Sequence, residues 1–211
     1  MPSNAEIERI LRLSPVMPVV TLEDSALAPE LARALARGGI RVVEMTLRTP
    51  AALAAIEAIA RHVPEVAVGA GTVLSAEDLR AAADAGAAFA ISPGCTRELL
   101  AAGTASPIPY LPAVATASEI MQGLAFGFRC FKFFPAAMAG GTATLKAFQG
   151  PFPQARFCPT GGITEESVAA YLAMPNVLCA GGSWLATAET IAARDWSRIG
   201  SLASQAAALR T

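Results

Sequence analysis

The sequence predicts an α/β protein that folds as a (β/α)8 barrel with a short N-terminal helix. Short apolar runs, several of them rich in Val and Phe, alternate along the whole chain with Ala- and Leu-rich amphipathic segments. The expected strands begin roughly 20 to 25 residues apart, which is the length of one strand–helix unit with short loops. The chain length of 211 residues lies near the lower end for such a barrel and fits one domain over residues 1–211.

Eight strands are expected, at residues 16–21, 42–45, 67–70, 89–92, 110–111, 130–133, 156–159 and 177–180. Their apolar runs are continuous, which indicates that both faces of each strand are buried, as in a parallel sheet. Parallel neighbours need crossover connections, and the helical segments between the strands supply them. Eight such units favour a closed sheet, the TIM barrel, and leave a doubly wound open sheet as the alternative.

The expected helices lie between the strands, at residues 28–37, 50–61, 76–85, 96–102, 118–126, 142–148 and 165–172. A helix at residues 5–13 precedes the first strand, and a segment at 196–209 completes or follows the eighth helix. Ser75 and Thr164 each precede acidic residues at a helix start and are expected to be N-caps. No linker, low-complexity segment or second domain is apparent.

Charge and composition argue against two classes of partner. The formal net charge is −1 and the charged residues are dispersed, so neither nucleic acid nor an anionic membrane surface is an expected partner. No apolar stretch is long enough to span a membrane, and the N-terminus lacks the order of a signal peptide. A cytoplasmic protein is expected.

The cysteines do not predict a metal or disulfide site. Cys95, Cys130, Cys158 and Cys179 form no Cys-x-x-Cys pair, and His62, the one histidine, lies near none of them in sequence. Three of the four cysteines lie in apolar strand candidates. Small buried side chains are the expected role.

Polar residues follow most of the expected strands at their carboxyl ends, where barrel enzymes place their active sites. Lys132 stands out because it lies between Phe131 and Phe133, and the chain has only one other lysine, Lys146. Burying an ammonium group is unfavourable, so the neutral amine should become available as a nucleophile for a carbonyl carbon. The alternative is a lysine whose head group reaches solvent.

Glu44 interrupts the apolar run VVEM and could act as a general acid/base beside such an amine. The alternative is a structural ion pair with Arg41 or Arg48. Arg48 and Thr72 could hold a carboxylate, although Arg48 also fits a solvated loop. Two glycine turns, TGG at 160–162 and GGS at 181–183, could present backbone N–H groups to a phosphate, or could be ordinary tight turns.

These residues belong to longer motifs that resemble a known family. The stretches GGIRVVEMTLRT, VGAGTVL, FAISPG, FKFFPA, GPFPQARFCPTGGI and VLCAGGSW are similar to those of the 2-keto-3-deoxy-6-phosphogluconate (KDPG)/4-hydroxy-2-oxoglutarate (KHG) aldolases. The resemblance runs from near residue 15 to near residue 200. It implies a class I aldolase of the Entner–Doudoroff pathway that is a homotrimer and uses a lysine Schiff base, with no metal or other cofactor.

The resemblance also implies a role for individual residues. Lys132 would form the Schiff base, and Glu44 would be the general acid/base. The substrate-binding positions would be Arg48 and Thr72 for the pyruvate carboxylate, Pro93 and Phe134 along the site, and Thr160, Gly161, Gly162, Gly182 and Ser183 for the phosphate. Relatives often carry Gly where this chain has Ala113, a difference that could tune substrate preference.

The implied reaction cleaves 2-dehydro-3-deoxy-6-phosphogluconate to pyruvate and glyceraldehyde 3-phosphate, so the expected partner is a small keto-acid phosphate. The same site could also cleave 4-hydroxy-2-oxoglutarate to pyruvate and glyoxylate. Alternatives are an aldolase for the galactonate epimer, a cofactor-free phosphosugar isomerase or epimerase, and a non-catalytic phosphosugar-binding protein. An isomerase would not need an essential amine, which separates it from the aldolases.

Overall fold

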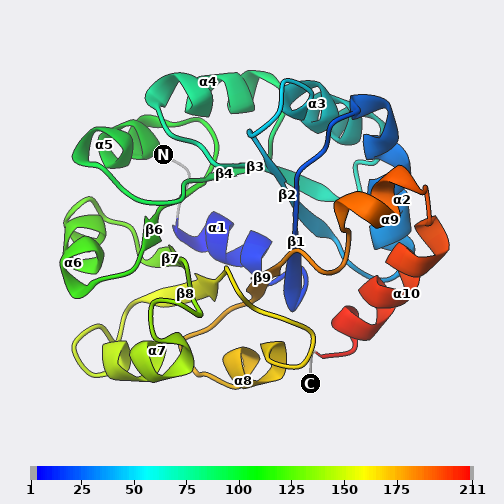
Figure 1. The fold of residues 1–211 in the computed structure, drawn as a ribbon. Helices are drawn as coiled ribbons and strands as arrows, with labels where there is room; N and C mark the ends of the chain where they lie inside the picture. Colours follow the sequence, from blue (N-terminus) through cyan, green and yellow to red (C-terminus); the bar gives the residue numbers. More distant parts are fainter. Residues whose placement is uncertain (1–3, 210–211) are drawn as a thin grey trace.

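The computed structural model describes residues 4–209, with strands around a common interior and helices outside them (Figure 1). The helices are α1 (Asn4–Leu11), α2 (Ala28–Arg37), α3 (Ala52–His62), α4 (Ala76–Asp84), α5 (Arg97–Ala105), α6 (Ala117–Ala125), α7 (Gly141–Gln149), α8 (Val168–Leu172), α9 (Ala188–Ala192) and α10 (Trp196–Ala207), with a 3-10 turn η1 (Ser25–Leu27). The strands are β1 (Val16–Val20), β2 (Val42–Thr46), β3 (Ala67–Gly71), β4 (Phe89–Ile91), β5 (Tyr110–Leu111), β6 (Ala113–Val114), β7 (Cys130–Phe133), β8 (Arg156–Pro159) and β9 (Ala180–Gly182).

The prediction of a closed eight-stranded TIM barrel is wrong, because the strands form two separate sheets. A six-stranded half-barrel has the order β5-β4-β3-β2-β1-β9, and a three-stranded sheet has the order β6-β7-β8. The fifth strand forms where it was expected, as β5, but Pro112, which has no N–H to donate, separates it from the additional short strand β6; β5 pairs with β4, and β6 pairs with β7. At the other boundary only the isolated bridges Phe157–Val177 and Thr160–Gly181 join the sheets.

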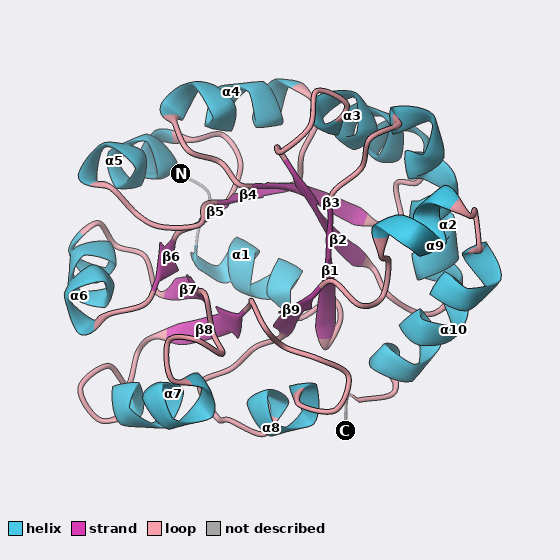
Figure 2. Ribbon diagram, viewed as in Figure 1, coloured by secondary structure: helices cyan, strands magenta, loops and turns pink. Residues whose placement is uncertain are grey.

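The strand pairs are all parallel, as the continuous apolar runs indicate. Helices α2 to α8 and α10 lie outside the strands (Figure 2). A doubly wound sheet would carry helices on both faces, so that alternative does not describe this chain either.

Side chains of each strand alternate between two cores. One set, including Val43, Val68 and Phe131, packs outward against the helices. The inner core is the second buried cluster, which gathers inward-facing strand residues, two residues just before β9 and three residues of α1. Its members are Ile7, Ile10, Leu11, Met17, Val42, Phe89, Ile91, Leu111, Cys130, Cys158, Leu178 and Cys179.

Helix α1 covers the end of the interior where the strands begin. Its apolar face packs on inner-core residues near the strand starts, and it lies at the centre of the view in Figure 1. Asn4 fixes the helix by donating to the Gly127 carbonyl at 2.8 Å and accepting from the Arg129 N–H at 2.9 Å. The opposite end, where the strands finish, is left for the polar residues.

Most expected helices form within a few residues of their predicted ends. The Ser75 N-cap is confirmed, since Ser75 and Asp78 form a reciprocal capping box at α4. The Thr164 N-cap is wrong: α8 starts only after Ser167, whose hydroxyl instead accepts from the Thr164 N–H at 2.9 Å.

Within residues 4–209, no helix combines the length and the apolar character that crossing a membrane requires.

Candidate active site

Lys132 and Glu44 form a buried ion pair inside the molecule. Lys132 Nζ lies 2.9 Å from Glu44 Oε1 and 3.2 Å from Oε2. The lysine is 5% exposed and the glutamate 1%. Both structural alternatives are therefore wrong, because the lysine head does not reach solvent and the partner of Glu44 is not an arginine.

The alternation of side chains explains why these two residues meet. On β7, Phe131 and Phe133 pack in the outer core, so Lys132 between them must face the interior. On β2, Val43 and Met45 pack outward in the same way and turn Glu44 inward. Because β2 lies in the half-barrel and β7 in the three-stranded sheet, the ion pair also joins the two sheets.

Arg48 and Thr72 contact each other just beyond the ends of β2 and β3. Arg48 Nε donates a hydrogen bond to Thr72 Oγ1 at 3.2 Å. Thr72 has φ +61°, a left-handed conformation that β-branched residues rarely adopt. Backbone strain of this kind persists only where the surrounding structure enforces it, and it concentrates at functional sites. Arg48 is exposed, so its forked donors suit a carboxylate that arrives from solvent.

Phe134 lies beside the ion pair at the end of β7. Its ring centroid is 5.3 Å from Lys132 Nζ, a distance at which an aromatic face attracts a cation. The ring is half-buried and also flanks Gly161, where an added Cβ would lie 3.1 Å from it. Phe134 thus connects the amine to the first glycine turn.

The two glycine turns lie side by side. Gly161 and Gly162 have φ +99° and +72°, conformations that glycine adopts without strain. The Ala137 N–H donates to the Gly161 carbonyl at 3.0 Å, which holds the loop after β7 against this turn. Thr160 is bridged to Gly181 at the end of β9, and its hydroxyl lies where a Cβ of Gly181 would be.

Trp184 covers the second glycine turn. Its ring occupies the position that a Cβ of Gly182 would take, so the indole packs directly on that backbone. Ser183, between them, is exposed.

Pro93 is held near the end of β4 by a buried hydroxyl pair. Ser92 Oγ lies 2.5 Å from the Tyr110 hydroxyl and donates to the Gly94 carbonyl at 2.6 Å. Burial raises the pKa of Tyr110, so its hydroxyl stays protonated as a hydrogen-bonding group. These contacts fix the turn that carries Pro93.

Three of the four cysteines, Cys130, Cys158 and Cys179, are buried, and Cys95 is half-buried. Burial raises the pKa of Cys130 to about 12 and that of Cys95 to about 11, so both thiols stay protonated. The Cys179 thiol donates to the Cys158 sulfur at 3.5 Å within the inner core. Among the described residues, no group of three or more His, Cys, Asp or Glu side chains is placed to bind a metal ion.

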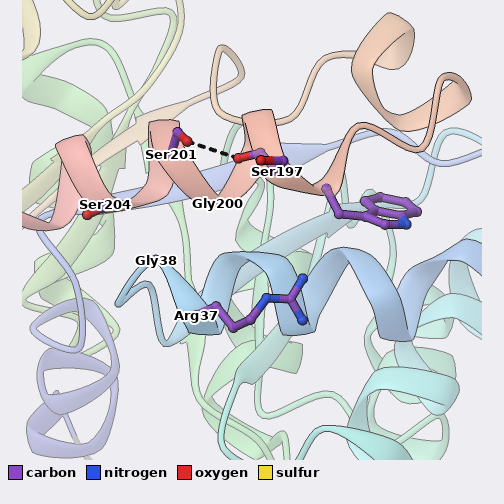
Figure 3. Close-up of a pocket in the computed structure, with 7 residues that line it drawn as sticks. Arg37, Gly38, Ser197, Gly200, Ser201 and Ser204 are labelled. Carbon is purple, nitrogen blue, oxygen red and sulfur yellow. Dashed lines mark hydrogen bonds between the residues drawn. The ribbon is translucent and has the colours of Figure 1, made fainter.

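A shallow pocket on the outside of the molecule, between α2 and α10, carries a different set of residues (Figure 3). Arg37, Trp196 and several serines line it, and Ser201 donates to the Ser197 carbonyl at 3.0 Å. It contains no lysine or carboxylate. Of the interior site and this outer pocket, therefore, only the interior site places a nucleophilic amine beside an acid.

The family model described as KDPG and KHG aldolase matches residues 7–202. The chain belongs to this family. The matched range contains every residue of the interior site. Family membership was expected from the sequence motifs and is confirmed by this match.

Individual KDPG and KHG aldolases are similar over nearly the whole chain. The 2-dehydro-3-deoxy-phosphogluconate aldolase of Pseudoalteromonas atlantica is 53% identical over 92% of this chain and 90% of its own length. The KHG/KDPG aldolase of Escherichia coli K12 is 51% identical over 94% and 93%.

Solved structures of the family share this fold. The KDPG aldolase of Legionella pneumophila, with pyruvate captured as a covalent carbinolamine, has a TM-score of 0.93 and 48% identity over 95% of this chain and 97% of its own. The Zymomonas mobilis ZM4 enzyme with 3-phosphoglycerate has a TM-score of 0.93 and 47% identity over 99% and 98%. A structure named KDPGal, 24% identical with a TM-score of 0.82, shares the fold alone.

The structure brings most of the expected site residues into three groups at the carboxyl ends of the strands, with Pro93 apart from them at the end of β4. Lys132, Glu44 and Phe134 form one group, Arg48 and Thr72 another, and the glycine turns a third. Sequence reasoning missed Ser92, Tyr110 and Trp184. Ser92 was visible in the motif FAISPG and Trp184 in the motif VLCAGGSW, whereas the contact of Tyr110 with Ser92 joins residues distant in sequence.

Proposed function

We propose that this chain cleaves KDPG to pyruvate and glyceraldehyde 3-phosphate through a Schiff base on Lys132. The observation that carries the proposal is the buried Lys132–Glu44 pair, with Nζ and Oε1 at 2.9 Å. A carboxylate at this distance can accept the ammonium proton and leave a neutral amine in an apolar site. The Legionella relative, captured with covalent pyruvate, supports the same chemistry here.

The proposed reaction begins when neutral Lys132 attacks the C2 ketone and forms a carbinolamine. Glu44 protonates the departing hydroxyl, water leaves, and the protonated imine becomes an electron sink. Glu44 then takes the proton from the C4 hydroxyl while the C3–C4 bond breaks and its electron pair forms the enamine. Glyceraldehyde 3-phosphate departs, C3 is protonated, and water hydrolyses the imine to pyruvate. No metal or organic cofactor is needed in this scheme.

The remaining residues would bind the two ends of the substrate. Arg48 and Thr72, already in contact, would hold the pyruvate carboxylate. Pro93 and Phe134 would line the path between the two ends. The phosphate would be held by the turns, at Thr160, Gly161, Gly162, Gly182 and Ser183.

A second substrate is proposed on the same site. The Escherichia coli relative is named KHG/KDPG aldolase and is 51% identical, which supports cleavage of 4-hydroxy-2-oxoglutarate as a further activity.

We further propose one domain over residues 1–211, a cytoplasmic location and a homotrimer. Light scattering in solution tests the homotrimer, for which the measured mass should be three times that of one chain.

Borohydride trapping tests the Schiff base. In the presence of pyruvate, reduction should attach a stable adduct to Lys132, identified by mass mapping of peptides. Lys146, the only other lysine, is exposed on α7 and provides the control, because Lys146→Ala should be trapped as fully as the parent. An adduct on Lys146, or the absence of any adduct, would contradict the proposal. It would instead favour the isomerase or the non-catalytic phosphosugar-binding protein.

The glycine turns should make a phosphorylated substrate the better one. Each charge-assisted hydrogen bond contributes roughly 1.5 to 3 kcal/mol, and bonds remote from the reacting carbon can lower the barrier. We therefore expect kcat/KM for KDPG to exceed that for its dephosphorylated form by at least about 10²-fold. Gly162→Val should impair KDPG cleavage far more than 4-hydroxy-2-oxoglutarate cleavage, because the second substrate has no phosphate.

Gly127→Val is the matched control for that substitution. Gly127 also has a positive φ, +90°, but it lies at the opposite end of the strands beside Asn4. Its variant carries comparable backbone strain and should affect both substrates equally. Steady-state kinetics on the two substrates decides the matter: equal losses in Gly162→Val would mean that the turns are only structural.

A further inference from the structure

The inward face of β3 carries Ala67 and two glycines. Val68 and Ala70 point into the outer core, so Gly69 and Gly71 face the interior. A Cβ at Gly69 would overlap the Phe89 ring. A Cβ at Gly71 would instead overlap Glu44 Oε1 and lie 2.6 Å from its Cγ and 2.7 Å from its Cδ.

The backbone of Gly71 does not itself require glycine. Its φ is not among the positive values, so an L-residue could adopt this conformation without strain. The carboxylate of Glu44 therefore occupies the space that a side chain at position 71 would need. Oε1, the overlapped atom, is also the oxygen that Lys132 Nζ approaches at 2.9 Å.

The strand could not easily yield to such a side chain. The Gly71 carbonyl accepts from the Leu47 N–H at 2.8 Å, and β3 is paired with β2 on one side and β4 on the other. The Glu44 side chain would have to move instead. Its displacement would alter the distance to Lys132.

We infer that Gly71 is a positioning residue, whose missing side chain places the Glu44 carboxylate against Lys132. This inference rests on the proposed function, in which Glu44 transfers protons at the lysine. A methyl group at position 71 displaces the carboxylate while every catalytic group remains present. Misplacement by about 1 Å can reduce turnover by about 10²-fold.

The experiment compares Gly71→Ala, Glu44→Asp and the double variant. Gly71→Ala should lower kcat by about 10²-fold and change KM much less, with an altered pH profile of kcat. Glu44→Asp removes one methylene where Gly71→Ala adds one methyl, so the double variant conserves volume. Gly71→Ala should accordingly lower kcat by less than about threefold in the Glu44→Asp background, a non-additivity expected of residues in contact.

Gly69→Ala is the control for crowding alone. It presses on Phe89 rather than Glu44, so it should lower Tm but leave the pH profile of the folded enzyme unchanged. If Gly71→Ala does not fold, the double variant should still fold with the Tm of Glu44→Asp. Parent-like kcat in Gly71→Ala, or losses that simply add in the double variant, would overturn the inference. A parent that borohydride does not trap would reject the proposed function instead, and the Tm comparison would still decide whether positions 44 and 71 are coupled.

Discussion

Lys132→Arg should abolish KDPG cleavage, with kcat lower by at least about 10⁴-fold, the scale seen when a covalent nucleophile is removed. Arginine keeps a cation beside Glu44, so the buried carboxylate stays paired and the fold should survive. A guanidinium, however, is not deprotonated in proteins and cannot attack the ketone. The measurement is pyruvate release with KDPG, together with borohydride trapping, which should yield no adduct.

Two further variants complete this prediction. Lys146→Arg makes the same chemical change on the exposed face of α7 and should retain the parent kcat. Lys132→Met leaves Glu44 buried without a partner, which typically destabilises a protein by about 3–5 kcal/mol. Urea unfolding should therefore show a lower midpoint for Lys132→Met than for Lys132→Arg. Measurable cleavage by Lys132→Arg above a thousandth of the parent rate would rule out the lysine as the nucleophile.

Glu44→Gln should keep pyruvate binding but lower kcat by about 10² to 10⁴-fold, the usual contribution of a general acid/base. The amide is nearly isosteric and can still accept a hydrogen bond from Lys132, but it cannot carry a proton between steps. The Lys132 amine is itself unchanged in this variant, so borohydride trapping with pyruvate should persist.

The contrast between trapping and turnover is the decisive measurement for Glu44. A variant that is trapped like the parent but turns over slowly has lost proton transfer and not Schiff-base formation. Glu57→Gln, on the exposed surface of α3, is the matched control and should keep the parent kcat. Near-parent turnover in Glu44→Gln would remove Glu44 from the proton path.

The sequence predicts the positions of the strands better than their pairing. Seven strands begin at their expected residues because apolar runs mark burial locally. The additional strand β6, just beyond Pro112, was missed because a strand of two residues gives no apolar run of its own. The last strand was expected at 177–180 but forms at Ala180–Gly182, since pairing with β1 overrides the low strand preference of glycine. Helix α9 (Ala188–Ala192) is too short to give a helical period.

The sequence predicts those site residues that stand out individually from their neighbours. Lys132 and Glu44 stand out because each is an ionisable residue within an apolar run. Their proximity was expected, but the direct ion pair depends on how the two sheets face each other and could not be deduced. Gly71 was missed for a related reason. A glycine leaves space for a neighbouring side chain, but the sequence does not show which neighbour fills that space. Here the neighbour is Glu44, which belongs to another strand.

The position of the ion pair between the two sheets affects how the chain acquires its reactivity. The two partners are 88 residues apart, and neither sheet contains both. A chain on the ribosome, or one stalled with a single sheet formed, has Lys132 without Glu44 beside it. Docking of the two sheets therefore assembles the pair in one event. A folding intermediate that lacks either sheet lacks the complete pair.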